Sequence, residues 1–429
     1  MSVRIESSLT ATKKGGSEID AGEAFSQVVA VMDAILKRSA KVNGEIEYVA
    51  TSSFLHSLVG VDPRGKPTTK VFGWADTRSG KHTQVLRKKF DESETHNRTG
   101  AHFHSSYWPA KLLWLRKEFP DKFTKTARWL SFSDFVSMRL FGETMTSISM
   151  ASATGIFDIR KCTWDTELLK FLKVKTSALP LLPDSDSATF TLTKTFAKRW
   201  PRLANAKWFP AMGDGMADNI GAGCITKNKA ALMIGTSAAM RVAYTGEPPK
   251  QIPKGLWCYR IDRTRVIVGG ALSDGGNLYA LIKHRFRLPA NTDRLIQQRG
   301  TADDDLIVIP FFFGERSTGY NEDARGAIVG LKPTHDGIDV LRAAMEGVAF
   351  RLAEICERLG TVAKFSEIVA SGGALRESPV WAQIISNVLE RDLKMSETDE
   401  SSMRGAVLFA IGNIETIMDN KISAKAKKL

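Results

Sequence analysis

The sequence predicts an α/β protein of two domains, and three observations support this. The chain has 429 residues, 43% of them AVILMFWYC, which is enough for two or three hydrophobic cores. Strand-like runs alternate with amphipathic helical patterns in both halves. Glycine-rich turns directly follow two strand-like runs of the second half. We place the seam at Thr226–Lys229, so that the domains span residues 1–225 and 226–429.

The first half begins with alternating residues typical of an edge strand, Val3–Ala11, and a turn at Lys13–Gly16. Asp20 is placed to cap a helix over Ala21–Arg38, where apolar residues recur at helical spacing. The elements expected next are strands at Ile46–Ser53 and Lys70–Trp74, a turn at Asp62–Pro67, and a helix at Trp129–Leu140 that stops at Gly142.

The second half has longer and more apolar patterns. Asp336–Leu359 is the longest helical pattern of the chain, and Ala231–Ile234 is a buried-type strand. The other expected elements are strands at Arg265–Gly269, Leu306–Phe313 and Glu367–Ala370, and helices at Val380–Leu389 and Met403–Met418.

Composition excludes several classes of protein. No apolar run approaches the roughly 18 residues that a membrane helix needs, and no signal-peptide core follows Met1, so we expect a soluble, cytoplasmic protein. The four cysteines lack CxxC spacing, which argues against disulfides and zinc and favours buried apolar roles.

The net charge of +13 raises the alternative of a nucleic-acid partner. The basic residues occur in short clusters over the whole length, and no nucleic-acid-binding motif accompanies them. A solvated surface is therefore the favoured explanation, followed by attraction of small anionic substrates.

Three glycine-rich turns are candidate ligand sites: Gly213–Gly223, Ile234–Ser237 and Ala370–Ala374. Such turns let a backbone approach phosphate oxygens closely, but each alone is more often a tight turn. Neither a Walker A lysine motif nor a dinucleotide fingerprint is present.

Taken in order, these turns resemble the FGGY carbohydrate kinases. The resemblance extends to PFFFGERSTGYNEDARGAIVGL (310–331), MEGVAF (345–350), SGGALRESPVWAQIISNVL (371–389) and RGAVLFA (404–410). It implies two actin-like (ribonuclease H-like) ATPase domains with sugar and ATP held in an interdomain cleft, and it suggests a homo-oligomer. A gluconate-like substrate is favoured, because HSSYWPAKLLWL (104–115) is most similar to the gluconate kinase branch.

The resemblance also assigns candidate substrate residues. SSFLHSLVGVDPRGKP (52–67) and FGWADTRSG (72–80) match the family's sugar-side segment, which implies that His56, Asp76 and Arg78 line the sugar pocket. The alternative for His56 is a core histidine with its hydrogen bonds satisfied, and the alternative for Asp76 and Arg78 is a structural ion pair.

For the catalytic base, the family pattern of an Asp, small residues and Gly-x-Gly is matched backward from Gly221 and Gly223 and leads to Asp214. Asp218 occupies a position where the family has a small residue, so it competes for the role. Asp214 could instead serve only to cap a helix.

ATP binding is implied for a larger set of residues, with Mg²⁺ expected on the phosphates. These nucleotide candidates are Gly235, Thr236, Ser237, Gly269, Gly270, Gly372, Gly373 and Ala374. Turn and junction roles are the alternatives for the glycines.

One part of the family pattern is missing. Family members begin with a strand carrying an Asp-x-Gly-Thr-type loop and a second strand, whereas Val3–Ala11 resembles the third strand. An incomplete N-terminal domain is therefore expected. A missed upstream start is favoured over a separate polypeptide that supplies the hairpin and over a decayed kinase that binds sugar or nucleotide without turnover.

Overall fold

The computed structural model describes residues 1–6, 9–12, 14–185, 189–299, 305–398 and 400–412. The chain divides into two compact units. The first comprises Met1–Gly223, Tyr259–Arg265 and the chain from Glu400 onward, and the second comprises Cys224–Cys258 and Val266–Asp399. The first break in the chain therefore lies two residues from the expected seam between residues 225 and 226.

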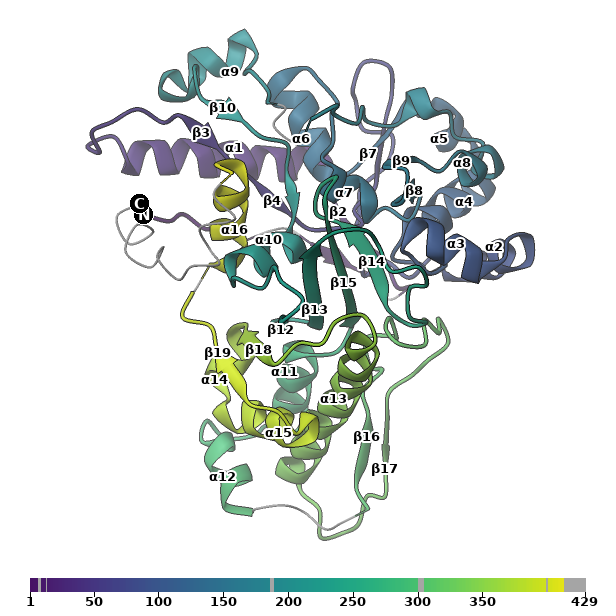
Figure 1. Ribbon diagram of the computed structural model, residues 1–429, viewed down its shortest axis with the longest axis vertical. Helices are drawn as coiled ribbons and strands as arrows, with labels where there is room; N and C mark the ends of the chain where they lie inside the picture. Colours follow the sequence, from purple (N-terminus) through teal and green to yellow (C-terminus); the bar gives the residue numbers. More distant parts are fainter. Residues whose placement is uncertain (7–8, 13, 186–188, 300–304, 399, 413–429) are drawn as a thin grey trace. The chain divides into compact units, whose positions relative to one another are not determined.

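Short strands and many helices build the first unit (Figure 1). β1 (Thr10–Ala11) pairs antiparallel with β2 (Ser17–Ile19), and β2 pairs with β6 (Val71–Phe72). The prediction of a strand over Val3–Ala11 is wrong for most of its length, because residues 3–6 and 9 are not in a strand. Residues 7, 8 and 13 lie outside the described residues.

The predicted strand Ile46–Ser53 is broken into two, β3 (Tyr48–Val49) and β4 (Ser52–Ser53). Each pairs in parallel with one strand, β3 with β10 (Lys207–Trp208) and β4 with β11 (Met212–Gly213). The next strand along the chain is β5 (Val59–Val61), which pairs antiparallel with β7 (Arg128–Leu130).

Two helices of this unit show how local sequence sets their ends. α1 spans Ala21–Arg38 as predicted, and the Asp20 carboxylate accepts hydrogen bonds from the amides of Gly22 and Glu23. The predicted helix Trp129–Leu140 is partly wrong, because residues 128–130 form β7 and α6 begins only at Phe132. Ser131 caps α6 (Phe132–Phe141), which ends at Gly142 in the left-handed conformation.

The remaining helices and strands of the first unit are also short. They are η1 (Gly80–His82), α2 (Thr83–Lys89), α3 (Glu92–Thr99), α4 (Trp108–Glu118), α5 (Pro120–Lys125), α7 (Ile148–Ser152), β8 (Phe157–Asp158), β9 (Thr163–Trp164), α8 (Thr166–Leu172), η2 (Thr176–Ala178), α9 (Lys194–Arg199), η3 (Pro201–Leu203), α10 (Asp214–Gly221) and α16 (Ser401–Ala410). Helix α16 begins two residues before the predicted start, and residues 413–418 of that prediction lie outside the described residues.

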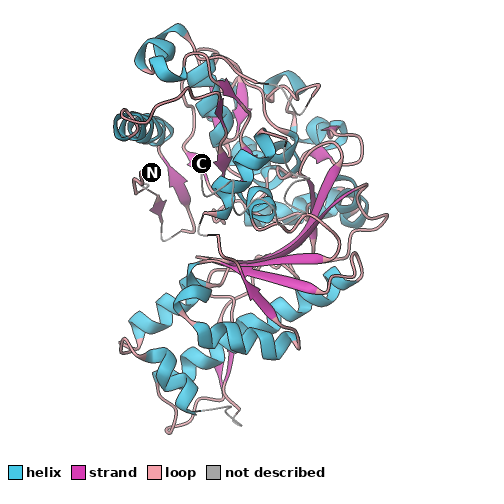
Figure 2. Cartoon of the chain, turned by 60° about the vertical axis from the view of Figure 1, so that its left-hand side comes forward, coloured by secondary structure: helices cyan, strands magenta, loops and turns pink. Residues whose placement is uncertain are grey.

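A six-stranded sheet forms the core of the second unit, in the order β14-β15-β13-β12-β18-β19. Figure 2 shows its strands fanning out with a pronounced twist. The strands are β12 (Lys229–Ile234), β13 (Ala238–Thr245), β14 (Trp257–Arg260), β15 (Arg265–Leu272), β18 (Glu367–Ser371) and β19 (Leu393–Met395). Strands β12 and β18 are parallel, so their carboxyl ends meet at one edge.

Helices pack against this sheet and against each other (Figure 1). Trp381 of α15 (Pro379–Leu389) donates its indole N–H to the Met345 carbonyl of α13 (Gly337–Gly360) and stacks on Tyr279 of α11 (Gly276–Arg285). The Asp336 side chain caps α13, in agreement with the predicted start. The other elements are α12 (Thr292–Arg299), α14 (Gly373–Glu377) and the hairpin β16 (Ile307–Ile309) with β17 (Ala327–Val329), which is shorter than the strand predicted over Leu306–Phe313.

Helices α10 and α16 cross at two glycines. A Cβ atom at Gly405 would overlap the Ala217 carbonyl oxygen, and one at Gly221 would overlap the Ser401 carbonyl oxygen. Because both neighbours are backbone atoms, neither can move aside without shifting a helix.

We therefore expect Gly405→Ala to lower the free energy of unfolding by about 1–3 kcal/mol, as overpacked substitutions do. Denaturant unfolding measures the change. Gly360→Ala is the matched control, since nothing lies within 4 Å of a Cβ at that helical position. Equal stability of the two variants would contradict the close crossing.

Candidate functional site

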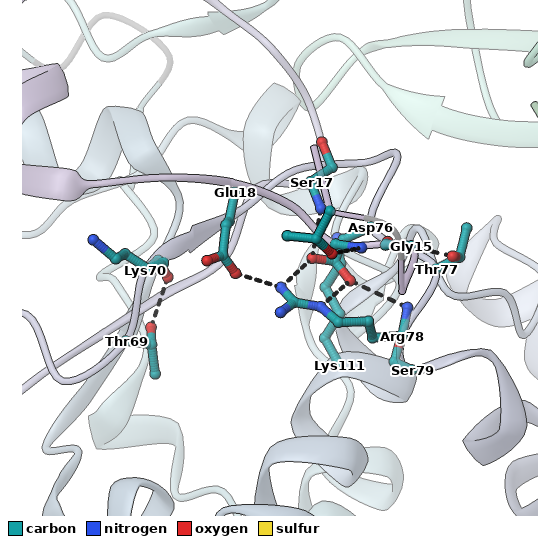
Figure 3. Close-up of polar contacts among 12 residues, drawn as sticks. Gly15, Ser17, Glu18, Thr69, Lys70, Asp76, Thr77, Arg78, Ser79 and Lys111 are labelled. Carbon is teal, nitrogen blue, oxygen red and sulfur yellow. Dashed lines mark hydrogen bonds and ion pairs between the residues drawn. The ribbon is translucent and has the colours of Figure 1, made fainter. Parts of the chain in front are cut away.

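The first group of candidate residues lies in the first unit around Arg78 (Figure 3). Its guanidinium binds both oxygens of Asp76, with Nε 3.1 Å from Oδ1 and Nη2 2.5 Å from Oδ2, and Nη2 also lies 2.6 Å from Glu18 Oε2. The planar group lies over the rings of Phe72 and Trp114. Two carboxylates and two aromatic rings thus fix Arg78, and its side chain remains 23% exposed.

Asp76 organises the backbone around this cation. Its carboxylate is 2% exposed and accepts the amides of Ser17, at 3.0 Å, and of Arg78, at 3.2 Å. Burial opposes the charge of Arg78, but the hydrogen bonds that Arg78 donates to Asp76 and Glu18 outweigh burial and raise the pKa of Arg78. The structural ion pair considered from the sequence therefore exists, and its cation still reaches solvent.

His56 lies in the same unit, in the loop that follows β4. Its backbone is left-handed, with φ 65°, and its ring Nδ1 lies 2.6 Å from the Ala153 carbonyl oxygen. A carbonyl oxygen only accepts, so Nδ1 carries the proton in this contact. The ring meets Tyr107 and Tyr259 edge to face, and the hydroxyls of these two tyrosines are 2.6 Å apart.

The two competing carboxylates in α10 have different surroundings. Asp214 is the first residue of the helix, is exposed, and accepts the Gly215 amide at 2.8 Å. Asp218 is buried, and the hydroxyl of Ser401 in α16 donates to it. The N-cap residue is Gly213, so Asp214 is not the N-cap.

In the second unit, the predicted nucleotide loops converge at one edge of the sheet. The loop at Gly235–Ser237 follows β12, and Gly372–Ala374 follows its parallel neighbour β18. The Gly235 carbonyl accepts the Gly276 amide at 2.9 Å, and the Thr236 carbonyl accepts the Asn277 amide at 3.0 Å, so the N-terminus of α11 joins the same edge.

Two glycines at this edge permit close backbone packing. Gly372 has φ 104°, and a Cβ there would overlap the Ile234 carbonyl. A Cβ at Gly276 would lie 2.5 Å from the Gly235 carbonyl oxygen. Thr236 itself is exposed, and a Cβ at Gly373 would meet nothing within 4 Å.

Gly269 and Gly270 lie elsewhere, within strand β15. A Cβ at Gly269 would lie 2.7 Å from the Trp257 ring, and one at Gly270 would lie 2.6 Å from Ile355 of α13. Close packing is thus a sufficient reason for glycine at both positions. Their assignment to the nucleotide site stays a prediction.

The residues that sequence reasoning missed are Glu18, Lys111 and the segment at Gly275–Asn277. Lys111 had a visible signal, because it is the single charge in the apolar run WPAKLLWL (108–115). Glu18 had none, since a lone glutamate in a polar stretch is ordinary. Among the described residues, no group of three or more His, Cys, Asp or Glu side chains is arranged to hold a metal ion. The four cysteines are buried, as predicted.

Comparison with known proteins decides the family. The model of the FGGY family of carbohydrate kinases, N-terminal domain, matches residues 2–221, and that of the C-terminal domain matches residues 230–413. The chain belongs to the FGGY family of carbohydrate kinases. Its fold is accordingly the two-domain actin-like ATPase fold of these sugar kinases, and ATP is the co-substrate of the family.

Individual relatives agree with this assignment. Gluconokinase of Bacillus subtilis is 28% identical over 417 residues, which cover 90% of this chain and 79% of the relative. Xylulose kinase of the same organism is 24% identical over 410 residues, covering 94% and 81%. The crystal structure of gluconate kinase from Lactobacillus acidophilus has a TM-score of 0.87 at 27% identity and covers 97% of this chain and 86% of that one.

None of the helices in the described ranges of this FGGY kinase is long and apolar enough to cross a bilayer.

Asp274 is a buried acid of this kinase beside Gly275. Its carboxylate is 1% exposed and accepts the amides of Phe312 and Phe313. Burial raises the pKa of Asp274 from 3.8 to about 7, although the two amides and Arg316 act in the opposite direction. Between pH 4 and 7 the native state therefore holds a proton that the unfolded chain has lost.

It follows that this group's contribution to stability falls as pH rises from 4 to 7 and is fully lost above 7. We expect Asp274→Asn to remove this fall, so that the variant gains about 3 kcal/mol on the wild type between pH 5 and pH 8. Thermal unfolding of both proteins at the two pH values measures the gain. A stability difference that does not change with pH would contradict the raised pKa.

Proposed function

We propose that this FGGY kinase transfers the terminal phosphoryl group of ATP to a hydroxyl of a sugar acid, with gluconate as the favoured substrate. The observation that carries the choice is the similarity to gluconokinases, in sequence over 90% of the chain and in fold over 97%. The Arg78 guanidinium supports it, because its fork of N–H donors suits carboxylate and hydroxyl oxygens.

In this proposal the sugar is held by His56, Asp76 and Arg78. The ring of His56 and the guanidinium of Arg78 are each oriented by neighbours before substrate arrives, so little side-chain entropy is lost on binding. Asp76 acts mainly by holding Arg78 and the Ser17 amide, since its carboxylate is 2% exposed.

Asp214 is the proposed general base. It accepts the proton of the substrate hydroxyl as that oxygen attacks the terminal phosphorus. Its exposure at the start of α10 suits this role, whereas Asp218 is buried against Ser401. Asp218 is assigned to the contact between α10 and α16.

ATP is proposed to bind at the sheet edge formed by Gly235, Thr236, Ser237, Gly372, Gly373 and Ala374. The exposed Thr236 and the open space beside Gly373 offer a hydroxyl and backbone amides to phosphate oxygens. Mg²⁺ enters as part of the substrate, bound to the ATP phosphates, where it neutralises charge that develops in transfer.

The test is ADP release by the purified chain with ATP, Mg²⁺ and a panel of gluconate, xylulose, glycerol and xylitol. We expect the highest kcat/KM with gluconate. Gel filtration of the same preparation tests the proposed homo-oligomer. A folded protein that releases no ADP with any member of the panel would overturn the kinase proposal, and gluconate-dependent thermal shifts without turnover would support a binding protein instead.

A further inference from the structure

We propose that Lys111 is a positioning residue of the sugar side, which holds the loop of His56 and through it the His56 ring. This inference rests on the proposed function only in assigning the ring to the substrate. No motif or family match assigns a role to this lysine.

The ammonium of Lys111 is fully enclosed by protein. The side chain lies in the first turns of α4 and is 1% exposed. Its Nζ atom donates to two backbone carbonyls, those of His56 at 2.9 Å and Ser106 at 2.8 Å. The lysine thereby joins the loop after β4 to the loop before α4, and Figure 3 shows it beside Asp76 and Arg78.

The carbonyl that Lys111 binds belongs to a residue with an unusual backbone conformation. A residue other than glycine with a φ of 65° is strained, and it persists only where its surroundings hold it. The Lys111 bond to His56 O acts on the backbone, while Ala153 and Tyr107 hold the ring. The orientation of the imidazole therefore depends on all three contacts.

A buried lysine is an unfavourable residue for a purely structural contact, because its charge is removed from water. Burial disfavours its charge and lowers the pKa of Lys111 to about 7, with only Asp76 acting to raise it. The neighbouring positions Leu112 and Leu113 are apolar and fully buried, so the helix packs without polar groups there. The lysine occurs where α4 passes the loop that carries His56, and it lies beside Asp76 and Arg78.

The experiment compares Lys111→Met with the wild type in a double-mutant cycle with His56→Ala. We expect Lys111→Met to raise KM for gluconate at least tenfold and to change KM for ATP less than twofold. In the His56→Ala background the same change should have less than a twofold effect on KM for gluconate, because the residue through which Lys111 acts is gone. Lys117→Met, an exposed position on the same helix, controls for loss of charge.

A merely structural role predicts other results. It would lower thermal stability, leave both KM values unchanged and give additive effects in the cycle, as we expect for Leu112→Ala. Unchanged KM values for Lys111→Met, or additive effects of Lys111→Met and His56→Ala on KM for gluconate, would overturn the proposal. If Lys111→Met does not fold, Lys111→Gln keeps an uncharged NH2 donor group and should show a smaller rise in KM for gluconate.

A second readout needs no turnover. The imidazole ¹H–¹⁵N spectrum of the wild type should show His56 with its proton on Nδ1, and Lys111→Met should shift that signal or mix the two tautomers. An unchanged His56 signal in the folded variant would overturn the inference even if the protein phosphorylated no sugar. Failure of the proposed function and failure of this inference are thus separate results.

Discussion

Asp214→Asn is expected to fold normally and to lose at least about 10³-fold in kcat, within the range that general bases contribute. The carboxylate is exposed and its bond to Gly215 lies within the first turn of its own helix. An amide of the same shape therefore costs at most about 1 kcal/mol of helix-dipole stabilisation. Steady-state ADP release and thermal unfolding of the same preparation give the two quantities.

Asp218→Asn is the control within the same helix. Because Asp218 is buried and hydrogen-bonded to Ser401, its replacement should reduce stability and leave kcat per folded molecule within a few-fold of the wild type. The reverse outcome, an inactive Asp218→Asn beside an active Asp214→Asn, would exchange the two assignments.

Arg78→Met should have the second large effect, on both stability and sugar binding. It removes the cation from between Asp76 and Glu18 and leaves the Asp76 carboxylate buried with only backbone donors. Such an uncompensated charge typically costs about 3–5 kcal/mol. Denaturant unfolding measures this loss, and we expect KM for gluconate to rise at least about 100-fold, since charge-assisted hydrogen bonds to substrate are lost.

The double variant Asp76→Asn/Arg78→Met separates the two effects. Removing the buried charge together with its partner should restore most of the stability. The high KM for gluconate should remain, because the guanidinium is still absent. Recovery of a low KM in the stable double variant would show that Arg78 serves only the fold.

Several elements of the fold could be predicted because their ends are local chemistry. Asp20 and Asp336 cap α1 and α13 with their own side chains, and apolar residues at helical spacing continue each helix. The helix predicted from Trp129 was wrong at its start, because residues 128–130 form β7. This strand pairs with β5, about 70 residues earlier, and no local sequence pattern predicts that pairing. The strand predicted over Val3–Ala11 failed at residues 3–6 and 9 for the same reason, since alternation alone does not supply a partner strand.

The candidate site divides in the same way. His56, Asp76 and Arg78 follow from short motifs, and the structure brings Asp76 and Arg78 into contact because they are two residues apart. Glu18 and Lys111 approach this segment from about 60 and 30 residues away, across β2–β6 pairing and the packing of α4. Their roles depend on distances that no linear pattern contains.

Composition, capping residues and ordered motifs were thus sufficient to predict the family, the α/β class and the candidate base. Each of these depends on residues that are neighbours in the sequence. Only contacts between distant segments decided the rest. They determined which carboxylate of α10 is exposed, which glycines serve packing and which lysine is buried. Burial and hydrogen-bond partners belong to the folded chain, so the same residue type is exposed and proposed as a base at Asp214 but buried against Ser401 at Asp218.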